Sequence, residues 1–159
     1  MINLLIVGAG AIGRGYVPWE TSKVNLFFFD NDIELVDKLN KNKKYLSFMS
    51  YGDRLEEKEI NLVNAFSDTK EIDFEIFDIA IICVGPRNIF KLDPNFKKLK
   101  CPIYSLENDH KCVFDLRNIL ENELVYFGIP DVITSFTASP ESLAKDQLSI
   151  HTENGTMYF

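Results

Sequence analysis

Three glycines placed directly after the first apolar segment constrain this chain more than any other feature. Residues 2–7 form a short apolar run, and Gly8, Gly10 and Gly13 follow it in the spacing G-x-G-x-x-G. Such a run bounded by a glycine-rich turn predicts a buried strand, and the glycines predict a tight turn into a helix. Asp30 ends the next apolar run about 20 residues later. This order predicts the start of an α/β unit that binds a dinucleotide.

Each glycine has a separate physical role in such a loop. Gly8 permits the tight turn, Gly10 lets the backbone approach a diphosphate, and Gly13 allows the helix to pack closely on the strand. Ala11 and Ile12 begin the helix, where free N–H groups and the positive end of the helix dipole attract phosphate. We therefore expect these five residues to hold the diphosphate without a lysine.

Asp30 bears on the choice of cofactor. Its carboxylate is placed to accept hydrogen bonds from the adenosine ribose, and its charge repels the additional phosphate of NADP, so we expect NAD. Asn31 is expected beside the same ribose. Asp30 has a second interpretation as an acid that caps the following helix. Arg14 also has two interpretations: its side chain faces the phosphates, or it lies in solvent.

Composition and charge limit the partners. At 159 residues, with 46% hydrophobic and 26% charged residues, the chain fits a single globular domain spanning residues 1–159. The formal net charge of −7 argues against nucleic acid or an anionic membrane as a partner, because both require a basic surface. Because the N-terminus lacks a signal-peptide pattern and no apolar run is long enough to span a bilayer, we expect a cytoplasmic protein.

The remaining segments continue the alternation of strands and helices. We expect the first helix to be short or kinked near Val17, because Pro18 removes a backbone donor. Asp32 is expected to cap a helix whose apolar face holds Ile33, Val36 and Leu39. We expect strands at 24–29, 79–84, 102–106 and 148–153, a small hairpin or edge addition within 45–63, a helix at 111–121 and a helix start at Ser139.

These elements predict an α/β fold of the Rossmann type. We expect a doubly wound, mostly parallel sheet in a single domain, with helices on both faces. The run of Phe27, Phe28 and Phe29 is typical of a strand covered on both faces. Cys83, Cys101 and Cys112 are odd in number and lack C-x-x-C spacing, so we interpret them as reduced and structural.

Several motifs resemble the polyol-specific long-chain dehydrogenases, and among them the N-terminal domain of the mannitol-1-phosphate 5-dehydrogenase family. The glycine loop with its Arg14-Gly15 tail resembles that family's opening motif. Phe29-Asp30 resembles its next stretch. Val84-Gly85-Pro86 and Glu107-Asn108 resemble the turns after its fourth and fifth strands. The resemblance runs loosely from Ile2 to about Glu153.

The resemblance implies that Val84, Gly85 and Asn108 lie near the cofactor, with Asn108 close to the nicotinamide. This agrees with the general rule that ligands bind at the carboxyl ends of parallel strands. Two alternatives stay open. Gly85-Pro86 is also typical of an ordinary turn, and Asn108 or Asp109 is also typical of a helix cap.

The chain departs from the family in two places. An Asp-Arg pair of the family is replaced by Ser135-Phe136. The family's substrate site and catalytic lysine lie in a large helical C-terminal domain, and the sequence ends at Phe159, so we expect this catalytic domain to be absent. His110, which follows a strand end, is the one weak candidate for a catalytic base, although a histidine beside a helix start is commonly a surface residue.

Three functional hypotheses remain at this stage. The first is an NAD-dependent oxidoreductase of polyol-phosphate type, completed by a separate catalytic subunit or by a homo-oligomer. The second is a non-catalytic module that binds NAD as a sensor or regulator. The third is a remnant domain whose loop is empty. An exposed apolar patch beside the cofactor cleft favours the first, because the family's helical domain covers that surface. Met157 at the C-terminus is consistent with such a patch or with a terminal strand packed on the core.

Overall fold

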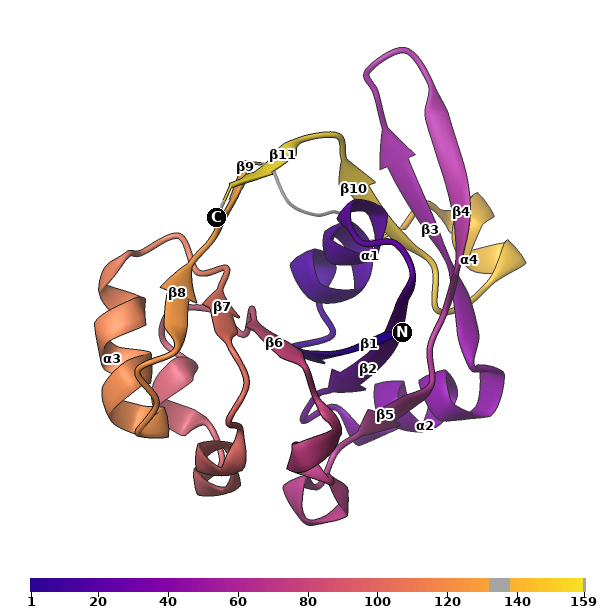
Figure 1. Cartoon of the computed structure of the whole chain (residues 1–159). Coiled ribbons are helices and arrows are strands. Elements are labelled where there is room, and N and C mark those ends of the chain that lie inside the picture. The colour runs from indigo at the N-terminus through magenta and orange to yellow at the C-terminus, as the bar shows by residue number, and fades with distance from the viewer. Residues whose placement is uncertain (132–137, 159) are drawn as a thin grey trace.

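A six-stranded parallel sheet forms the centre of the molecule (Figure 1). The computed structural model describes residues 1–131 and 138–158. The strand order is β5-β2-β1-β6-β7-β8, so the sheet grows in opposite directions from β1 and reverses between β1 and β6. This is the doubly wound Rossmann order. The strands are β1 (Ile2–Val7), β2 (Val24–Phe29), β5 (Asn64–Phe66), β6 (Ile79–Ile82), β7 (Ile103–Ser105) and β8 (Val125–Phe127).

Helical segments cover both faces of this sheet. One face packs against η1 (Ala11–Tyr16), α1 (Val17–Glu20) and α2 (Ile33–Asn42). The other packs against α3 (Lys111–Leu120) and short 3₁₀ turns. These turns are η2 (Thr69–Glu71), η3 (Phe74–Ile76), η4 (Ile89–Lys91) and η5 (Pro94–Lys98). The expected fold class is therefore confirmed.

The first helix changes its hydrogen-bonding pattern where a kink was expected. It is a π-helix from Ala11 to Tyr16 and an α-helix from Val17 to Glu20. Pro18 stands in the first turn of the α-helical part, where its missing N–H costs little. Only four residues follow the change, which confirms the expectation of a short or kinked helix.

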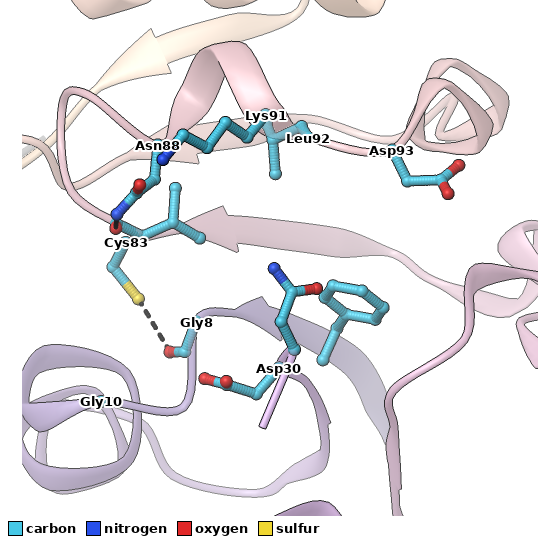
Figure 2. Close-up of a pocket in the computed structure, with 11 residues that line it drawn as sticks. Gly8, Gly10, Asp30, Cys83, Asn88, Lys91, Leu92 and Asp93 are labelled. Carbon is cyan, nitrogen blue, oxygen red and sulfur yellow. Dashed lines mark hydrogen bonds between the residues drawn. The ribbon is translucent and has the colours of Figure 1, made fainter. Parts of the chain in front are cut away.

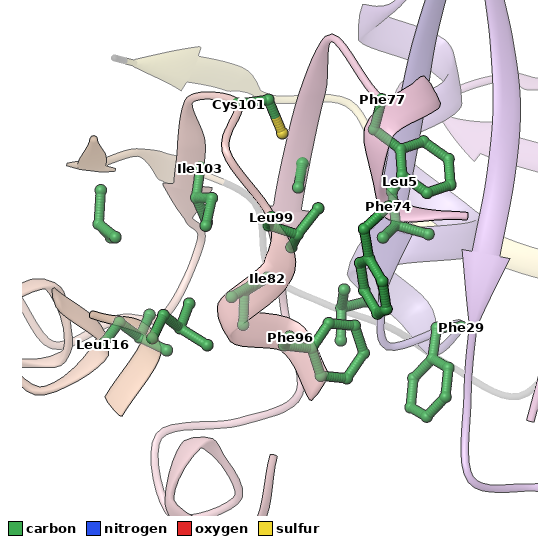
Figure 3. Packing of buried hydrophobic residues seen from close by; sticks show 14 of the residues in the cluster. Leu5, Phe29, Phe74, Phe77, Ile82, Phe96, Leu99, Cys101, Ile103 and Leu116 are labelled. Carbon is green, nitrogen blue, oxygen red and sulfur yellow. The ribbon is translucent and has the colours of Figure 1, made fainter. Parts of the chain in front are cut away.

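Alternating side chains of the central strands build two apolar cores. Phe27 and Phe29 enter one core and Phe28 the other, and all three are at most 7% exposed. In the first core, shown in Figure 3, the Phe29 and Phe96 rings meet edge to face with centroids 5.0 Å apart. Each buried aromatic ring removes a large apolar area from water, so these phenylalanines hold the helices onto the sheet.

A second sheet of three strands brings residues 44–61 together with residues 150–153. The expected hairpin is formed by β3 (Lys44–Ser50) and β4 (Leu55–Asn61), and β10 (Ile150–Glu153) pairs in parallel with β3. Between them in sequence, Ser139 caps α4 (Pro140–Lys145) as expected. A third sheet pairs β9 (Ile129–Asp131) with β11 (Thr156–Tyr158).

Two details differ from the sequence expectations. Ile33 was expected on the buried face of α2, but it is 64% exposed because it occupies the first helical position beside the Asp32 cap. Four strands of three residues each, β5, β8, β9 and β11, were not expected. β5 and β8 gain their places by pairing with a neighbour already in the central sheet, and β9 and β11 pair with each other.

Candidate functional site

Two of the loop glycines are required by the packing of the fold itself. Gly8 has a φ of +103°, and a Cβ there would lie 2.6 Å from the Cys83 carbonyl oxygen. A Cβ on Gly13 would lie 1.9 Å from the carbonyl oxygen of Gly8. The loop, the start of η1 and the end of β6 are therefore in close contact, and side chains at these positions would push them apart.

Gly10 is different, because nothing in the fold needs a glycine there. Its φ of −81° is outside the left-handed region, and a Cβ would meet no atom within 4 Å. Gly10 lines a cavity of about 390 Å³. The space beside its α-carbon is thus open, and Gly10 is exposed, so a molecule can approach the backbone closely there.

Figure 2 shows this cavity between two walls. Gly8, Gly10 and Asp30 lie along one wall, and Asn88, Lys91, Leu92 and Asp93 lie along the opposite wall. The second wall comes from the segment after β6, so the cavity opens at the carboxyl ends of β1, β2 and β6, where the strand order reverses. Open α/β sheets bind their ligands at this position.

The Asp30 carboxylate is held in place by backbone amides. Its Oδ2 accepts a hydrogen bond from the Ala9 N–H at 2.8 Å, and its Oδ1 accepts one from the Asp32 N–H at 3.0 Å. Asp32 itself caps α2 by accepting from the Leu35 N–H, so capping is the task of Asp32. Each carboxylate oxygen has a second lone pair, which leaves Asp30 able to accept hydrogen bonds from a ligand.

A second cavity of about 240 Å³ continues the site along the sheet edge. Ile12, Gly85 and Asn108 line it, together with Glu107, which is only 4% exposed. Cys83 lines both cavities and therefore marks the point where they meet. Asp30 and Glu107 follow the ends of β2 and β7, and Asn88, Lys91 and Asp93 come from the segment after β6.

Cys83 takes a structural role at this junction. Its Sγ donates to the Gly8 carbonyl oxygen at 3.3 Å. Burial, followed by the negative charges of Glu107 and Asp30, raises the pKa of this thiol far above its usual value. The thiol therefore stays protonated at neutral pH and does not act as a nucleophile.

The structure brings most of the sequence-predicted residues together. Gly8, Gly10, Asp30, Asn31 and Val84 line the first cavity. Ile12, Gly85 and Asn108 line the second. Ala11 begins η1 beside them, and Gly13 packs beneath the loop. Ser135 and Phe136, where the chain departs from the family motif, lie outside the described residues.

Two predicted residues lie away from the cavities. The Arg14 guanidinium donates to the carbonyl oxygens of Ala9, at 3.2 Å, and Leu148, and burial lowers its pKa. It lines neither cavity, so it neither faces the open site nor lies in solvent. The His110 side chain is 72% exposed and also lines neither cavity.

Four contributors were missed by the sequence reasoning. Asn88, Lys91 and Asp93 follow the turn after β6 and belong to no motif, so only the fold brings them to the first cavity. Glu107 was noted only as part of the Glu-Asn pair. The sequence signal for Glu107 is its position, because it is an acidic residue two places after the end of the buried strand β7.

An apolar groove of about 280 Å³ lies elsewhere, lined in part by Ile2, Val24 and Ile79. These residues stand at the amino ends of β1, β2 and β6, whereas the two cavities lie at the carboxyl ends. The groove is therefore not an apolar patch beside the two cavities, which is the feature that would favour the first hypothesis. Met157 lies in β11 and packs against the second core, which matches the terminal-strand alternative.

Within residues 1–131 and 138–158, no group of three or more His, Cys, Asp or Glu side chains is arranged to hold a metal ion. No helix in these residues has the length and apolar character needed to cross a bilayer.

Comparison with known proteins gives one curated relative and many solved structures. No protein-family model matches the chain. Mannitol-1-phosphate 5-dehydrogenase from Caldanaerobacter subterraneus subsp. tengcongensis is 31% identical over 103 residues, covering 62% of this chain and 27% of that enzyme. The chain thus spans about a quarter of this relative.

The solved structures share the fold at low sequence identity. Octopine dehydrogenase in complex with NADH and agmatine superimposes with a TM-score of 0.68 at 11% identity, over 96% of this chain and 39% of that chain. A 2-dehydropantoate 2-reductase from Geobacter metallireducens GS-15 gives 0.65 at 16%, over 98% and 48%. Both likenesses confirm the Rossmann-like fold, and in each the matched part is less than half of the larger protein.

Proposed function

We propose that this chain binds NAD and serves as the cofactor-binding part of an oxidoreductase. The observation that carries the proposal is Gly10, a glycine that the fold does not require, facing a cavity whose wall also presents the fixed Asp30 carboxylate. A side chain at Gly10 would occupy the space where a diphosphate approaches the backbone. The similarity to mannitol-1-phosphate 5-dehydrogenase and the fold shared with octopine dehydrogenase in complex with NADH support the same assignment.

The residues present fit the cofactor along its length. The diphosphate would lie at the start of the helical segment 11–20, beside the amides of Ala11 and Ile12. Asp30 and Asn31 would hold the adenosine ribose in the larger cavity, and Gly85 and Asn108 would flank the nicotinamide in the smaller one. When bound, NAD would supply a hydride acceptor for an alcohol substrate.

The charges of the larger cavity favour NAD over NADP. Lys91 is the one cationic side chain among the described residues that line it; Asp30 stands on the opposite wall, and Asp93 lies on the same wall as Lys91. A 2′-phosphate beside Asp30 would meet a carboxylate held by two amides and no arginine. Repulsion between the two anions therefore disfavours NADP.

We further propose that another chain or domain supplies the chemistry on a polyol-phosphate substrate. Oxidation of an alcohol needs a general base near the hydroxyl group. The smaller cavity offers Glu107, which already accepts two backbone hydrogen bonds, and the thiol of Cys83. No lysine or histidine is found among the described residues that line it, and Glu107 is held by the Val84 and Gly85 amides, so the base for the substrate would come from another chain or domain.

Calorimetric titration with NAD⁺, NADH and NADP⁺ tests the binding proposal. We expect the wild-type chain to bind NAD⁺ and NADH, and Gly10→Val to abolish both while remaining folded. Valine at this N-cap costs about 1 kcal/mol of stability, which thermal denaturation will register. Gly15→Ala is the matched control, because its Cβ would meet Ile150 at an ordinary 3.4 Å and points away from the cavities. Loss of binding in both variants, or in neither, would contradict the proposal.

Asp30→Asn tests the choice of cofactor. Asparagine keeps an oxygen that can accept the Ala9 N–H but removes the charge. We expect the preference for NAD⁺ over NADP⁺ to fall about ten-fold. An unchanged preference would assign Asp30 to loop structure alone.

Catalytic incompleteness is tested by adding mannitol 1-phosphate and NAD⁺ to the purified chain and following NADH absorbance. We expect no turnover from the chain alone, and turnover after addition of a fraction that contains the missing subunit. Turnover by the purified chain, at a rate that scales with its concentration, would contradict the need for a separate catalytic chain. Sedimentation in the same buffer separates a homo-oligomer from a monomer.

A further inference from the structure

Glu107 is an acidic side chain enclosed at the nicotinamide end of the proposed site. It follows β7, is only 4% exposed and lines the smaller cavity. Its Oε1 accepts hydrogen bonds from the N–H groups of Val84, at 2.8 Å, and Gly85, at 3.0 Å. Burial raises the pKa of Glu107, and the two backbone donors on one oxygen oppose this shift and orient the carboxylate.

The second oxygen of this carboxylate is left without a protein donor. Among the described residues, none donates a hydrogen bond to Glu107 Oε2. Oε2 is also absent from the buried side-chain atoms that lack a partner, so it is open to the solvent of the cavity, where a positively charged group of a ligand would meet it. The negative charge of Glu107 therefore faces the cavity, and no ion pair among the described residues neutralises it.

Among the described residues that line the cavity, none carries a positive charge that would neutralise this group. The other lining residues in the described part of the chain are apolar or uncharged, among them Ile12, Leu106, Pro130 and the Asn108 amide. Cys83 also lines the cavity and remains a neutral thiol. A charge on a ligand in this space therefore meets one carboxylate and no counter-charge.

The two redox forms of the cofactor differ in charge at this end of the molecule. The nicotinamide ring of NAD⁺ carries a positive charge, and the dihydronicotinamide ring of NADH is neutral. The adenosine and diphosphate parts are identical, so Asp30, Lys91 and Asp93 in the larger cavity act alike on both forms. Discrimination between the two must come from the smaller cavity.

We infer that Glu107 makes this site selective for the oxidised cofactor, binding NAD⁺ on the order of ten-fold more tightly than NADH. This inference rests on the proposed function and adds a redox preference to it. Ten-fold tighter binding of the oxidised form lowers the reduction potential of the bound two-electron couple by about 30 mV. Bound cofactor would thus be harder to reduce than free cofactor, and NADH would be released readily after a turnover.

Calorimetry with three ligands tests the inference. NAD⁺, NADH and ADP-ribose, which lacks the nicotinamide, are titrated into wild type and Glu107→Gln. Glutamine keeps an oxygen for the Val84 and Gly85 amides and loses the charge. We expect the variant to lose the preference for NAD⁺ while its affinities for NADH and ADP-ribose stay within about two-fold, because only the charge has changed.

Two further variants keep the test decisive. Glu123→Gln removes one charge at an exposed position outside both cavities, so it controls for net charge and should leave the preference intact. Asn108→Asp adds a charge to the same cavity and should increase the preference for NAD⁺, whether or not Glu107→Gln folds.

The outcomes separate the inference from the proposed function. Equal affinity of wild type for NAD⁺ and NADH overturns the inference and leaves the NAD site standing. Equal weakening of all three ligands by Glu107→Gln also overturns it, because the residue would then only hold the Val84-Gly85 turn. Failure of wild type to bind any of the three, ADP-ribose included, overturns the proposed function and the inference together.

Discussion

Replacing Gly13 with alanine adds one methyl group where the glycine loop, β1 and β6 meet. The new Cβ would lie 1.9 Å from the Gly8 carbonyl oxygen and 2.9 Å from both Cys83 Sγ and Ile6 Cγ2. The oxygen belongs to the backbone of a turn with a φ of +103°, so it cannot rotate away as a side chain would. The turn and the first helix must therefore separate by more than about 1 Å to restore normal contact.

The energetic cost follows from this displacement. Overpacking of a rigid interior costs about 3 kcal/mol or more when the backbone has to move. Alanine recovers up to about 1 kcal/mol through its higher helix propensity. We expect a net loss of about 2–3 kcal/mol in the free energy of unfolding, which lowers the melting temperature of a chain of this size by roughly 5–10 °C.

Urea and thermal denaturation followed by circular dichroism measure this loss. Gly15→Ala is the matched control, because it makes the same change two positions further along the same helical segment with an ordinary contact of 3.4 Å. We expect this control to equal wild type or to be slightly more stable. Equal stability of the Gly13 and Gly15 variants would refute the steric argument.

Three other substitutions test separate parts of the structure. Burial raises the pKa of Glu107 above its ordinary value of 4.5, so the contribution of this group to stability is fully present below about pH 4.5 and is lost as the pH rises through the folded-state pKa. The stability of Glu107→Gln relative to wild type should therefore increase between pH 4.5 and neutrality. Urea titrations at several pH values would measure this difference. Asp32→Ala removes the cap on the Leu35 amide and should cost about 1 kcal/mol by thermal denaturation, whereas no change would mean that water replaces the cap. Asn122→Ala leaves the Leu124 amide without its 2.8 Å acceptor and should cost about 2 kcal/mol by urea denaturation, and a cost below about 0.5 kcal/mol would count against that bond.

Much of the central fold could be predicted from local pattern. The apolar runs that became β1 and β2 are long enough to reveal a buried strand, and the glycine loop between them fixes the local geometry. By contrast, β5 and β8 have three residues each, too few for a periodic signal. They are strands because β2 and β7 offer free edges beside them.

The candidate site shows the same division. Gly8, Gly10 and Asp30 belong to a motif in which spacing in sequence corresponds to position in space, so they could be identified directly. Lys91 reaches the same cavity only because the chain turns back over the sheet edge after β6. Arg14 stands within the motif, yet its guanidinium contacts Leu148, a partner from the distant end of the chain that no local pattern specifies.

The pairing of β10 with β3 affects the order in which the chain can fold during synthesis. Ile150 pairs with Ser47 and lies beside Gly15, so the segment after the glycine loop is covered by residues that are translated long after it. Contacts so distant in sequence form late and slowly. A nascent chain that has completed β1, the loop and β2 still exposes one side of its first helix on the ribosome. Chaperone contact during translation would therefore fall on the side of η1 that β10 later covers.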